Sequence, residues 1–328
     1  MGGYVVTGAA GFIGRTLVAR LRAAGHDVRG VDVRADVALG VEAGDITDPG
    51  SWAHLIRSGD VVVHTAALVS NLPTLEEAWR VNTLGTRRVI EAAMAAGASR
   101  VVYLSSVRAF SDTGFPDGVS EDHPVRPDGN PYVDTRIAAE QVTLAAHASG
   151  QMETVVVRPG DVYGPGSRPW TVLPVQMMQA RQFLLPAFGR GVFSPVYVDD
   201  LVEGLVLAAD RPEAAGQVFT LAGGVGVSCR EFFGHYQRMV GRRAVLLPTW
   251  VALGLAWAKS VLVRVRGLDD ETNTTAVRYL CRTGTYSIEK ARRMLGYEPQ
   301  VGLEEGMRRT AEWLREEELV CRPPGTCT

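Results

Sequence analysis

The sequence has few cysteines, no surplus of basic charge and no long apolar run. Its 328 residues include 4 cysteines, and Lys plus Arg (34) nearly balance Asp plus Glu (36), for a formal net charge of -2. Without a basic field, the chain is a poor nucleic-acid binder, and no charged tail indicates docking onto a membrane. No cluster of histidines, cysteines or carboxylates has metal-ligand spacing. We therefore expect a small-molecule partner, no nucleic acid and no metal.

The cysteines and the N-terminus bear on the compartment. All four cysteines lie in the second half of the chain, and reduced thiols of a cytosolic protein are their simplest interpretation. The alternative is a disulfide between Cys321 and Cys327, which flank RPPGT. The strand-like GGYVVTGAA begins at once, without the basic segment, apolar run and cleavage site of a signal peptide. We predict a cytoplasmic protein.

The most apolar stretch, residues 245–258 (VLLPTWVALGLAWA), carries no charge. It is shorter than the ~20 apolar residues that a membrane span needs. We expect a buried or lid-forming helix in a substrate lobe, and no transmembrane span. The alternative is a weak contact with a membrane interface.

Short valine-rich runs alternate with longer amphipathic stretches through the first half of the chain. This alternation predicts an α/β fold in which a doubly wound parallel sheet, of the Rossmann type, is buried between helices. The expected strands are GYVVTG, HDVRGVDV, DVVVHTAA, SRVVYLSS and TVVVRPG, and the expected helices are 12–24, 49–57, 75–96 and 132–148. Gly25 and Gly97 follow the first and third of these helices, where a left-handed closing residue is favoured.

Beyond Pro159 the pattern loosens, before PVYVDDLVEGLVLAAD and QVFTLAGG supply a helix and two strand-like runs that we expect to return to the sheet. From about residue 223 the chain is mainly helical. The length suggests two domains at about 150 residues each. We predict a sheet domain from 1–160 and 191–222, and a smaller, mainly helical substrate lobe from 161–190 and 223–328.

The segment TGAAGFIG places Gly8, Gly11 and Gly14 between the first strand and the first helix. Glycines there permit a tight turn and close approach to a pyrophosphate, which binds the amides at the helix N-terminus. Asp32 ends the second strand, where a carboxylate accepts from both ribose hydroxyls of NAD and repels the 2'-phosphate of NADP. Arg34 would favour that phosphate instead. We predict that the sheet domain binds NAD rather than NADP.

Further motifs resemble those of one family. TGAAGFIG, Asp32, GDITD, HTAA, VNTLGT, YLSS, PYVDTR, RPGDVYGPG and PVYVDDLVEG occur in the order found in the extended short-chain dehydrogenases/reductases, the NAD-dependent epimerase/dehydratase superfamily. The similarity runs from the N-terminus to LGYEP and the last amphipathic helix. It implies an oxidoreductase in which a serine and a tyrosine act on an alcohol or carbonyl held against the nicotinamide. It also implies a homodimer through helices 75–96 and 132–148, although their apolar stripes equally suit packing on the sheet.

The predicted cofactor contacts extend along the carboxyl ends of the strands. Asp45 in GDITD could cap its own turn, touch the adenine edge, or do both. Asn82 matches a family position that organises the active site, although it could simply satisfy backbone groups. We interpret His64 as a hydrogen-bonded strand-end histidine. Besides the three glycines, the predicted cofactor contacts are Phe12, Ile13, Asp32, Arg34, Asp45, Ile46, Ala66, Asn82, Tyr132, Arg136 and Pro159.

The resemblance assigns catalysis to Ser106, Tyr132 and Arg136. Ser106 would hydrogen-bond the substrate oxygen, and Ser105 is the alternative. Tyr132 would be the general acid/base, and because a free tyrosine has a pKa of about 10, such a group needs a nearby cation. The family pattern is YxxxK, whereas this chain has YxxxR, which keeps the charge but has no proton to give up. The alternative for the pair is an exposed helix start with a solvated arginine.

The two residues before the PVYVDD motif bear on the kind of substrate. Phe193 and Ser194 stand where enzymes acting on nucleotide sugars commonly have Arg-Asp, leaving Arg158 and Arg190 as candidate anion partners. The apolar stretch and the HTAA and VYVDD forms are more similar to the 3beta-hydroxysteroid dehydrogenase branch. We predict interconversion of a secondary alcohol and a ketone on a hydrophobic molecule such as a steroid or polyketide. The alternatives are a nucleotide-sugar epimerase/dehydratase, or a dinucleotide-binding protein whose catalysis is impaired by Arg136.

Overall fold

The structure is a computed structural model and describes residues 2–70, 72–111, 115–265 and 274–320. The predicted alternative of a Cys321–Cys327 disulfide lies outside these residues. Cys229 and Cys281, within them, are free thiols.

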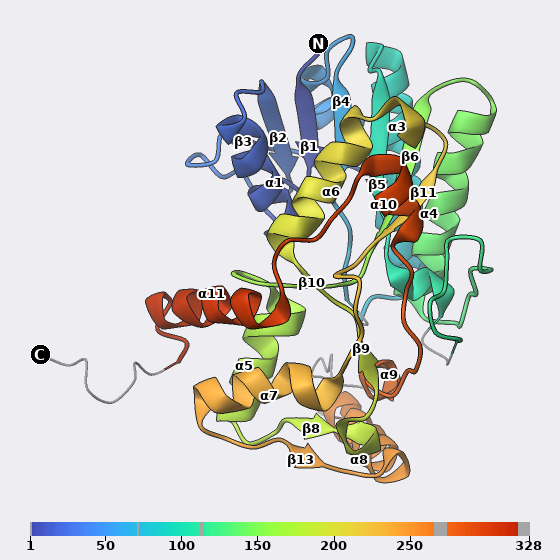
Figure 1. The fold of residues 1–328 in the computed structure, drawn as a ribbon. Coiled ribbons are helices and arrows are strands. Elements are labelled where there is room, and N and C mark those ends of the chain that lie inside the picture. The colour runs from blue at the N-terminus through green and yellow to red at the C-terminus, as the bar shows by residue number, and fades with distance from the viewer. Residues whose placement is uncertain (1, 71, 112–114, 266–273, 321–328) are drawn as a thin grey trace, which may run out of the picture.

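A seven-stranded sheet, in which every pair of neighbours is parallel, forms the centre of the larger domain (Figure 1). Its order is β11-β6-β5-β4-β1-β2-β3, so the chain reverses direction across the sheet between β1 and β4, the place where such sheets bind ligands. Valines fill the central strands and are buried, as predicted. The strands are β1 (Tyr4–Thr7), β2 (Val28–Asp32), β3 (Val41–Ala43), β4 (Val61–His64), β5 (Arg100–Leu104), β6 (Glu153–Pro159) and β11 (Val218–Leu221).

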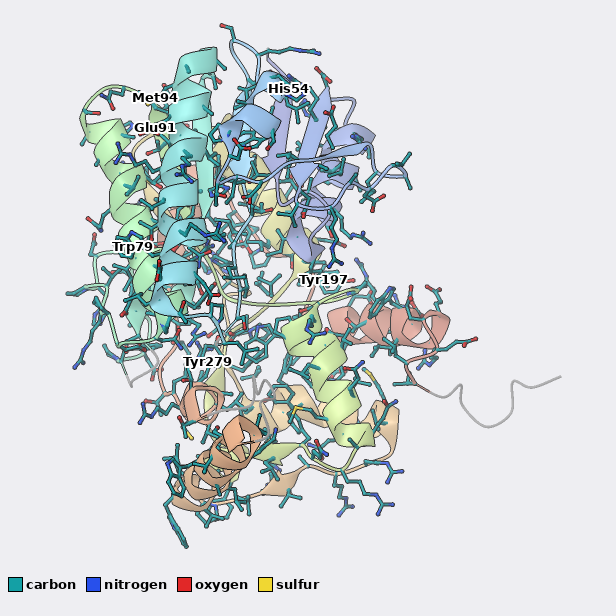
Figure 2. The ribbon with its side chains drawn as sticks, turned by 180° about the vertical axis from the view of Figure 1, so that it is seen from behind. His54, Trp79, Glu91, Met94, Tyr197 and Tyr279 are labelled. Atoms are coloured by element: carbon teal, nitrogen blue, oxygen red, sulfur yellow. The ribbon has the colours of Figure 1, made fainter. Side chains whose placement is uncertain are left out.

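Helices cover both faces of this sheet. α1 (Phe12–Ala23) packs with α6 (Val198–Asp210) on one face, and α3 (Thr86–Ala96) packs with α4 (Pro131–Ala148) on the other (Figures 1 and 2). Gly25 and Gly97 have φ of 85° and 73° beyond α1 and α3, so both predicted left-handed closures are confirmed.

Two of the predicted helices differ from those in the structure. Residues 75–96 form α2 (Leu75–Ala78), a π-helical segment η3 (Trp79–Gly85) and then α3. Asn82, within η3, bonds across to the backbone of Leu68 through its side chain, and π-helical segments often occur at functional sites. The predicted helix 49–57 is wrong. The chain forms two 3-10 turns, η1 (Pro49–Ser51) and η2 (Ala53–Leu55), separated by Trp52, whose non-helical backbone (φ -149°, ψ -17°) turns its indole fully into the core.

A smaller lobe lies beyond the carboxyl ends of the strands (Figure 1). Two separated pieces of chain build it, since β8 (Leu184–Leu185) pairs with β13 (Val245–Leu246) and α5 (Leu173–Gln179) contacts α7 (Cys229–Val240). The apolar stretch 245–258 is one strand and part of one helix, α8 (Thr249–Val265), separated by Pro248. The other elements here are η5 (Arg168–Val172), η6 (Pro186–Gly189), β9 (Val192–Phe193), β12 (Val227–Ser228) and α9 (Thr274–Tyr279).

The expected return to the sheet is half right. β11 joins the main sheet beside β6, whereas β10 (Pro195–Tyr197) pairs with β7 (Asp161–Tyr163) in a separate two-stranded sheet. The cause is local: the buried carboxylate of Asp161 accepts the Ser194 amide at 2.8 Å and so holds the incoming chain against β7. The remaining elements are η4 (Val107–Phe110), η7 (Pro212–Ala214), α10 (Glu289–Leu295) and α11 (Leu303–Glu316).

Candidate active site

A cavity of about 1300 Å³ extends from the turn after β1 into the smaller lobe. Two predicted cofactor residues, Arg34 and Asn82, are not in its lining. The predicted cofactor residues that do line it are Gly8, Gly11, Phe12, Ile13, Gly14, Asp32, Asp45, Ile46, Ala66, Tyr132, Arg136 and Pro159, and Ser106 lines it as well. Residues far apart in the sequence are therefore brought to one space.

The glycine turn cannot accept side chains at two of its three positions. Gly8 has φ of 71°, and a Cβ there would lie 2.6 Å from the Ala66 amide nitrogen. A Cβ at Gly14 would lie 2.0 Å from the Gly8 carbonyl oxygen, whereas one at Gly11 would approach only to 3.1 Å. Gly8 and Gly14 thus let the backbone close tightly at the N-terminus of α1, which faces the cavity and suits a pyrophosphate.

Backbone amides hold the two aspartates, Asp32 and Asp45, that were predicted to contact the cofactor. Asp32, at the end of β2, accepts from the Ala10 amide at 3.1 Å, which fixes the carboxylate beside the glycine turn. Asp45 accepts from the Thr47 amide at 2.8 Å, so the predicted capping of its turn is confirmed. Both also line the cavity, where their carboxylates can accept from hydroxyl or amino groups of a ligand.

The two serines that follow β5 make different contacts. The buried Ser105 hydroxyl donates to Glu140 Oε1 at 2.5 Å. Ser106 accepts from the Arg108 amide at 3.2 Å as the cap of η4, and this leaves its own hydroxyl hydrogen for another acceptor. Ser106 is therefore the serine that can donate to a substrate oxygen.

Tyr132 stands in the first turn of α4. The turn is set by Asn130, whose side-chain oxygen accepts from the amides of Tyr132 (2.9 Å) and Val133 (3.4 Å), and by Pro131 at the first helical position. Tyr132 is only 7% exposed and Arg136 only 2%. The alternative of an exposed helix start with a solvated arginine is therefore wrong.

Arg136 is a buried cation beside that tyrosine. Its Nη2 donates to the carbonyls of Leu104 and Ser105 (the second at 3.1 Å), and its guanidinium lies 5.7 Å from the centre of the Tyr132 ring. Nε and Nη1 are buried, and neither has a hydrogen-bond partner among the residues that the structure describes. A buried donor without a partner costs about 1–3 kcal/mol, and Arg136 also lines the cavity, so an acceptor that reached either nitrogen would offset this cost.

His64 is not part of the chemistry. Its Nδ1 lies 2.7 Å from Thr7 Oγ1 and its Nε2 3.0 Å from Thr86 Oγ1, so both ring nitrogens are satisfied, as predicted. Burial, and secondarily the charge of Arg136, lower the pKa of His64 to about 3. The imidazole is therefore neutral and structural.

Neither arginine named as an anion partner lies in the cavity lining. For Arg158 the prediction is wrong, because its Nε and Nη2 donate to both oxygens of the buried Glu140 at 2.9 and 2.7 Å. Arg190 stacks on Phe188 outside the cavity. Phe193 is fully buried against Phe232, with ring centres 4.1 Å apart.

Sequence reasoning missed two features beside the tyrosine. The guanidinium of Arg108 lies 5.3 Å from the centre of the Tyr132 ring and 5.2 Å from that of Tyr279. Tyr279 donates to the buried carboxylate of Asp161, which Arg282 Nη2 also contacts at 2.7 Å. The motif RPGDVYGPG contains Asp161, but only the folded chain shows partners 118 and 121 residues away.

The far end of the cavity is mainly apolar. Its lining there comes mainly from η5, α5, β8, η6, α7, α8 and α9, and consists largely of Pro169, Trp170, Leu173, Pro174, Met177, Phe183, Leu184, Pro186, Phe233, Ala252, Leu255, Ala256, Val277 and Leu280. Within the described ranges no group of His, Cys, Asp or Glu side chains could hold a metal ion. In the same part of the chain, no helix is long and apolar enough to cross a membrane.

This sheet, with the glycine turn at one end of the cavity, defines a dinucleotide-binding protein of the Rossmann type. Residues 4–222 match the model of the NAD dependent epimerase/dehydratase family, and the chain belongs to that family. It is therefore an enzyme of the extended short-chain dehydrogenase/reductase type, and its cofactor is NAD.

Relatives and solved structures agree with this assignment. The chain is 32% identical to the 2-alkyl-3-oxoalkanoate reductase of Stenotrophomonas maltophilia, over 93% of this chain and 97% of that one. It is 28% identical to a 3-beta-hydroxysteroid dehydrogenase of Mycolicibacterium neoaurum, over 94% and 90%. Its fold is similar to that of MoeE5 in complex with UDP-glucose and NAD, with a TM-score of 0.76, 29% identity and coverage of 97% and 100%.

Proposed function

We propose that this enzyme interconverts a secondary alcohol and a ketone on a hydrophobic molecule, of which a steroid or polyketide is the model. The observation that carries the proposal is the single cavity that joins the glycine turn, Ser106 and Tyr132 to a mainly apolar far end. Apolar walls with few polar groups select apolar ligands. The relatives named as a 3-beta-hydroxysteroid dehydrogenase and an oxoalkanoate reductase support the same class of reaction.

In this proposal each polar residue has one task. Bound NAD supplies the hydride acceptor or, reduced, the hydride donor. The ionised oxygen of Tyr132 takes the alcohol proton in oxidation, and the hydroxyl formed in this way returns the proton in reduction. The Ser106 hydroxyl donates to the same substrate oxygen and stabilises the charge that develops on it. Arg136 favours the ionised tyrosine electrostatically, and it stays protonated throughout because arginine does not deprotonate in proteins.

The residues present also fit the cofactor. The glycine turn and the N-terminus of α1 would hold the pyrophosphate, and Asp32 the adenosine ribose. The partnerless Nη1 of Arg136 would donate to the nicotinamide ribose, in the place that the family lysine takes. Asn82 would act indirectly, since it holds the backbone of Leu68 in the loop that lines the cavity.

A nucleotide-sugar epimerase or dehydratase is the second candidate. It is favoured by the cationic side chains of Arg80, Arg108 and Arg168 in the cavity lining, which could bind a diphosphate, and by the similarity to MoeE5. A third candidate, a dinucleotide-binding protein impaired by Arg136, predicts cofactor binding without turnover.

The test is turnover of NAD and NADP by the native chain with a panel of sterols, polycyclic ketones, and UDP- and dTDP-sugars. We expect activity with apolar alcohols or ketones and NAD. Activity confined to nucleotide sugars would rule out the proposed hydrophobic substrate, and tighter binding of NADP than of NAD would overturn the role of Asp32.

We also propose a homodimer that forms through the α2–α3 and α4 surfaces. Light scattering of the full chain would test this proposal.

A further inference from the structure

We infer that the outer face of α8 is a docking surface for an anionic lipid bilayer. The membrane-facing surface consists of Trp250, Trp257 and Val261, which are 77%, 65% and 43% exposed. Positions 250, 257 and 261 are spaced by seven and four residues and therefore lie on one side of the helix. Two large, exposed tryptophans on one helix face are unusual for a surface that only meets water.

The opposite side of the same helix lines the cavity. Ala252, Ala256 and Lys259 are spaced at helical intervals and belong to the cavity lining. The core of the lobe therefore does not require the tryptophans, because the inward side of α8 already provides the packing. The outer side carries apolar area that nothing in the described structure covers.

The segment that leads into α8 is basic, which favours an anionic partner. Residues 232–263 contain no Asp or Glu, and their cations are Arg238, Arg242 and Arg243, on and just after α7, and Lys259, on the cavity side of α8. This segment is strongly basic in a chain whose net charge is -2. Arg242 and Arg243 are exposed and lie one residue before β13, from which the chain leads into α8 (Figure 1). No salt bridge involves either of them in the part of the chain that the structure describes.

These features together fit the interface of a bilayer rather than its interior. Tryptophan prefers the headgroup level, and a helix with an apolar face flanked by basic residues lies in the interface plane. Since α8 separates the cavity from this surface, docking would place the apolar end of the cavity next to the lipid. The inference does not depend on which substrate the cavity binds.

Flotation of the full chain with lipid vesicles tests the inference. We expect binding to vesicles of phosphatidylcholine and phosphatidylglycerol in equal parts, and at least tenfold weaker binding to phosphatidylcholine alone or at high salt. Trp250→Gln with Trp257→Gln should weaken binding about tenfold or more, because the apolar anchor is lost. Arg242→Gln with Arg243→Gln should weaken it about tenfold or more on anionic vesicles only.

A matched control is available. Val37→Gln with Val225→Gln removes two side chains that are 92% and 65% exposed but lie outside α8, and it should leave vesicle binding unchanged. Equal binding of the native chain and the double-tryptophan variant would overturn the inference. A second pair of results would also overturn it: the native chain does not bind vesicles, and light scattering shows that it is an oligomer while the double-tryptophan variant is a monomer. In that case a second copy of the chain would cover the outer face of α8.

Discussion

Replacement of Arg136 by methionine should separate cofactor binding from folding. In the free protein the change removes two hydrogen bonds from Nη2, to Leu104 and Ser105, but it also removes two buried donors for which the described part of the chain offers no partner. Hydrogen bonds of charged groups contribute about 1.5–3 kcal/mol each, and unpaired buried donors cost about 1–3 kcal/mol each. The opposing effects nearly cancel, so we expect the free energy of unfolding to change by less than about 2 kcal/mol.

Binding of NAD should change much more. If Nη1 donates to the nicotinamide ribose, Arg136→Met loses one charge-assisted hydrogen bond, and about 1.5–3 kcal/mol corresponds to a rise in Kd of about 10- to 150-fold. Arg136→Lys keeps the charge at this position, so a smaller rise and measurable turnover are expected. Calorimetric titration with NAD, urea unfolding and the absorbance of reduced cofactor measure the three quantities.

The control is Arg22→Met, because Arg22 also donates to two backbone carbonyls, those of Val28 and Leu39, but lies outside the cavity. Its Kd for NAD should equal that of the native chain. The reasoning is refuted if Arg136→Met binds NAD as tightly as the native chain does. A native chain without turnover, beside an active Arg136→Lys variant, would show that arginine does not support the reaction.

Three further predictions follow from the geometry. Gly14→Ala should abolish NAD binding in calorimetry, because its Cβ would lie 2.0 Å from a carbonyl oxygen, whereas Gly11→Ala (3.1 Å) should weaken it far less. Glu140→Ala leaves Arg158 buried without its partner and should lower the free energy of unfolding in urea by about 3–5 kcal/mol. Because the pKa of His64 is lowered to about 3, its contribution to stability is full above about pH 6.5 and is lost as the pH falls toward 3, so the stability difference between the native chain and His64→Asn should narrow in acid.

The sequence pattern predicted the parallel sheet because its strands are valine-rich and buried on both faces, and periodicity detects such runs. It missed β3, which has only three residues. It also mistook 49–57 for a helix, because the packing of Trp52 in the core sets the backbone conformation there and the sequence pattern does not show this packing. The glycine turn was predictable from its strand-turn-helix context. The roles of Arg108 and Arg158 were not, since their aromatic and acidic partners come from other elements.

The choice between Ser105 and Ser106 depends on hydrogen-bond partners that are known only from the folded chain. Both serines line the cavity, but the Ser105 hydroxyl is taken up by Glu140 of α4, whereas the Ser106 hydroxyl keeps its hydrogen for another acceptor. On α4, Tyr132, Arg136 and Glu140 follow one another at intervals of four residues and therefore share one side of the helix. Arg136 bonds the backbone at the end of β5, and Glu140 bonds the Ser105 hydroxyl there.

Glu140 also binds Arg158 on β6, so two charged residues fix α4 to two neighbouring strands of the sheet. The tyrosine one turn before Arg136 is thereby held at the carboxyl ends of those strands. An arginine suits this position better than its chemistry alone suggests, because its planar group can bond the backbone at the end of β5 through one nitrogen and still have two further nitrogens that can donate. Arg136 thus keeps the positive charge of the family lysine and helps to position α4. Because it does not give up a proton, a proton taken up by Tyr132 must leave by a route that does not pass through Arg136.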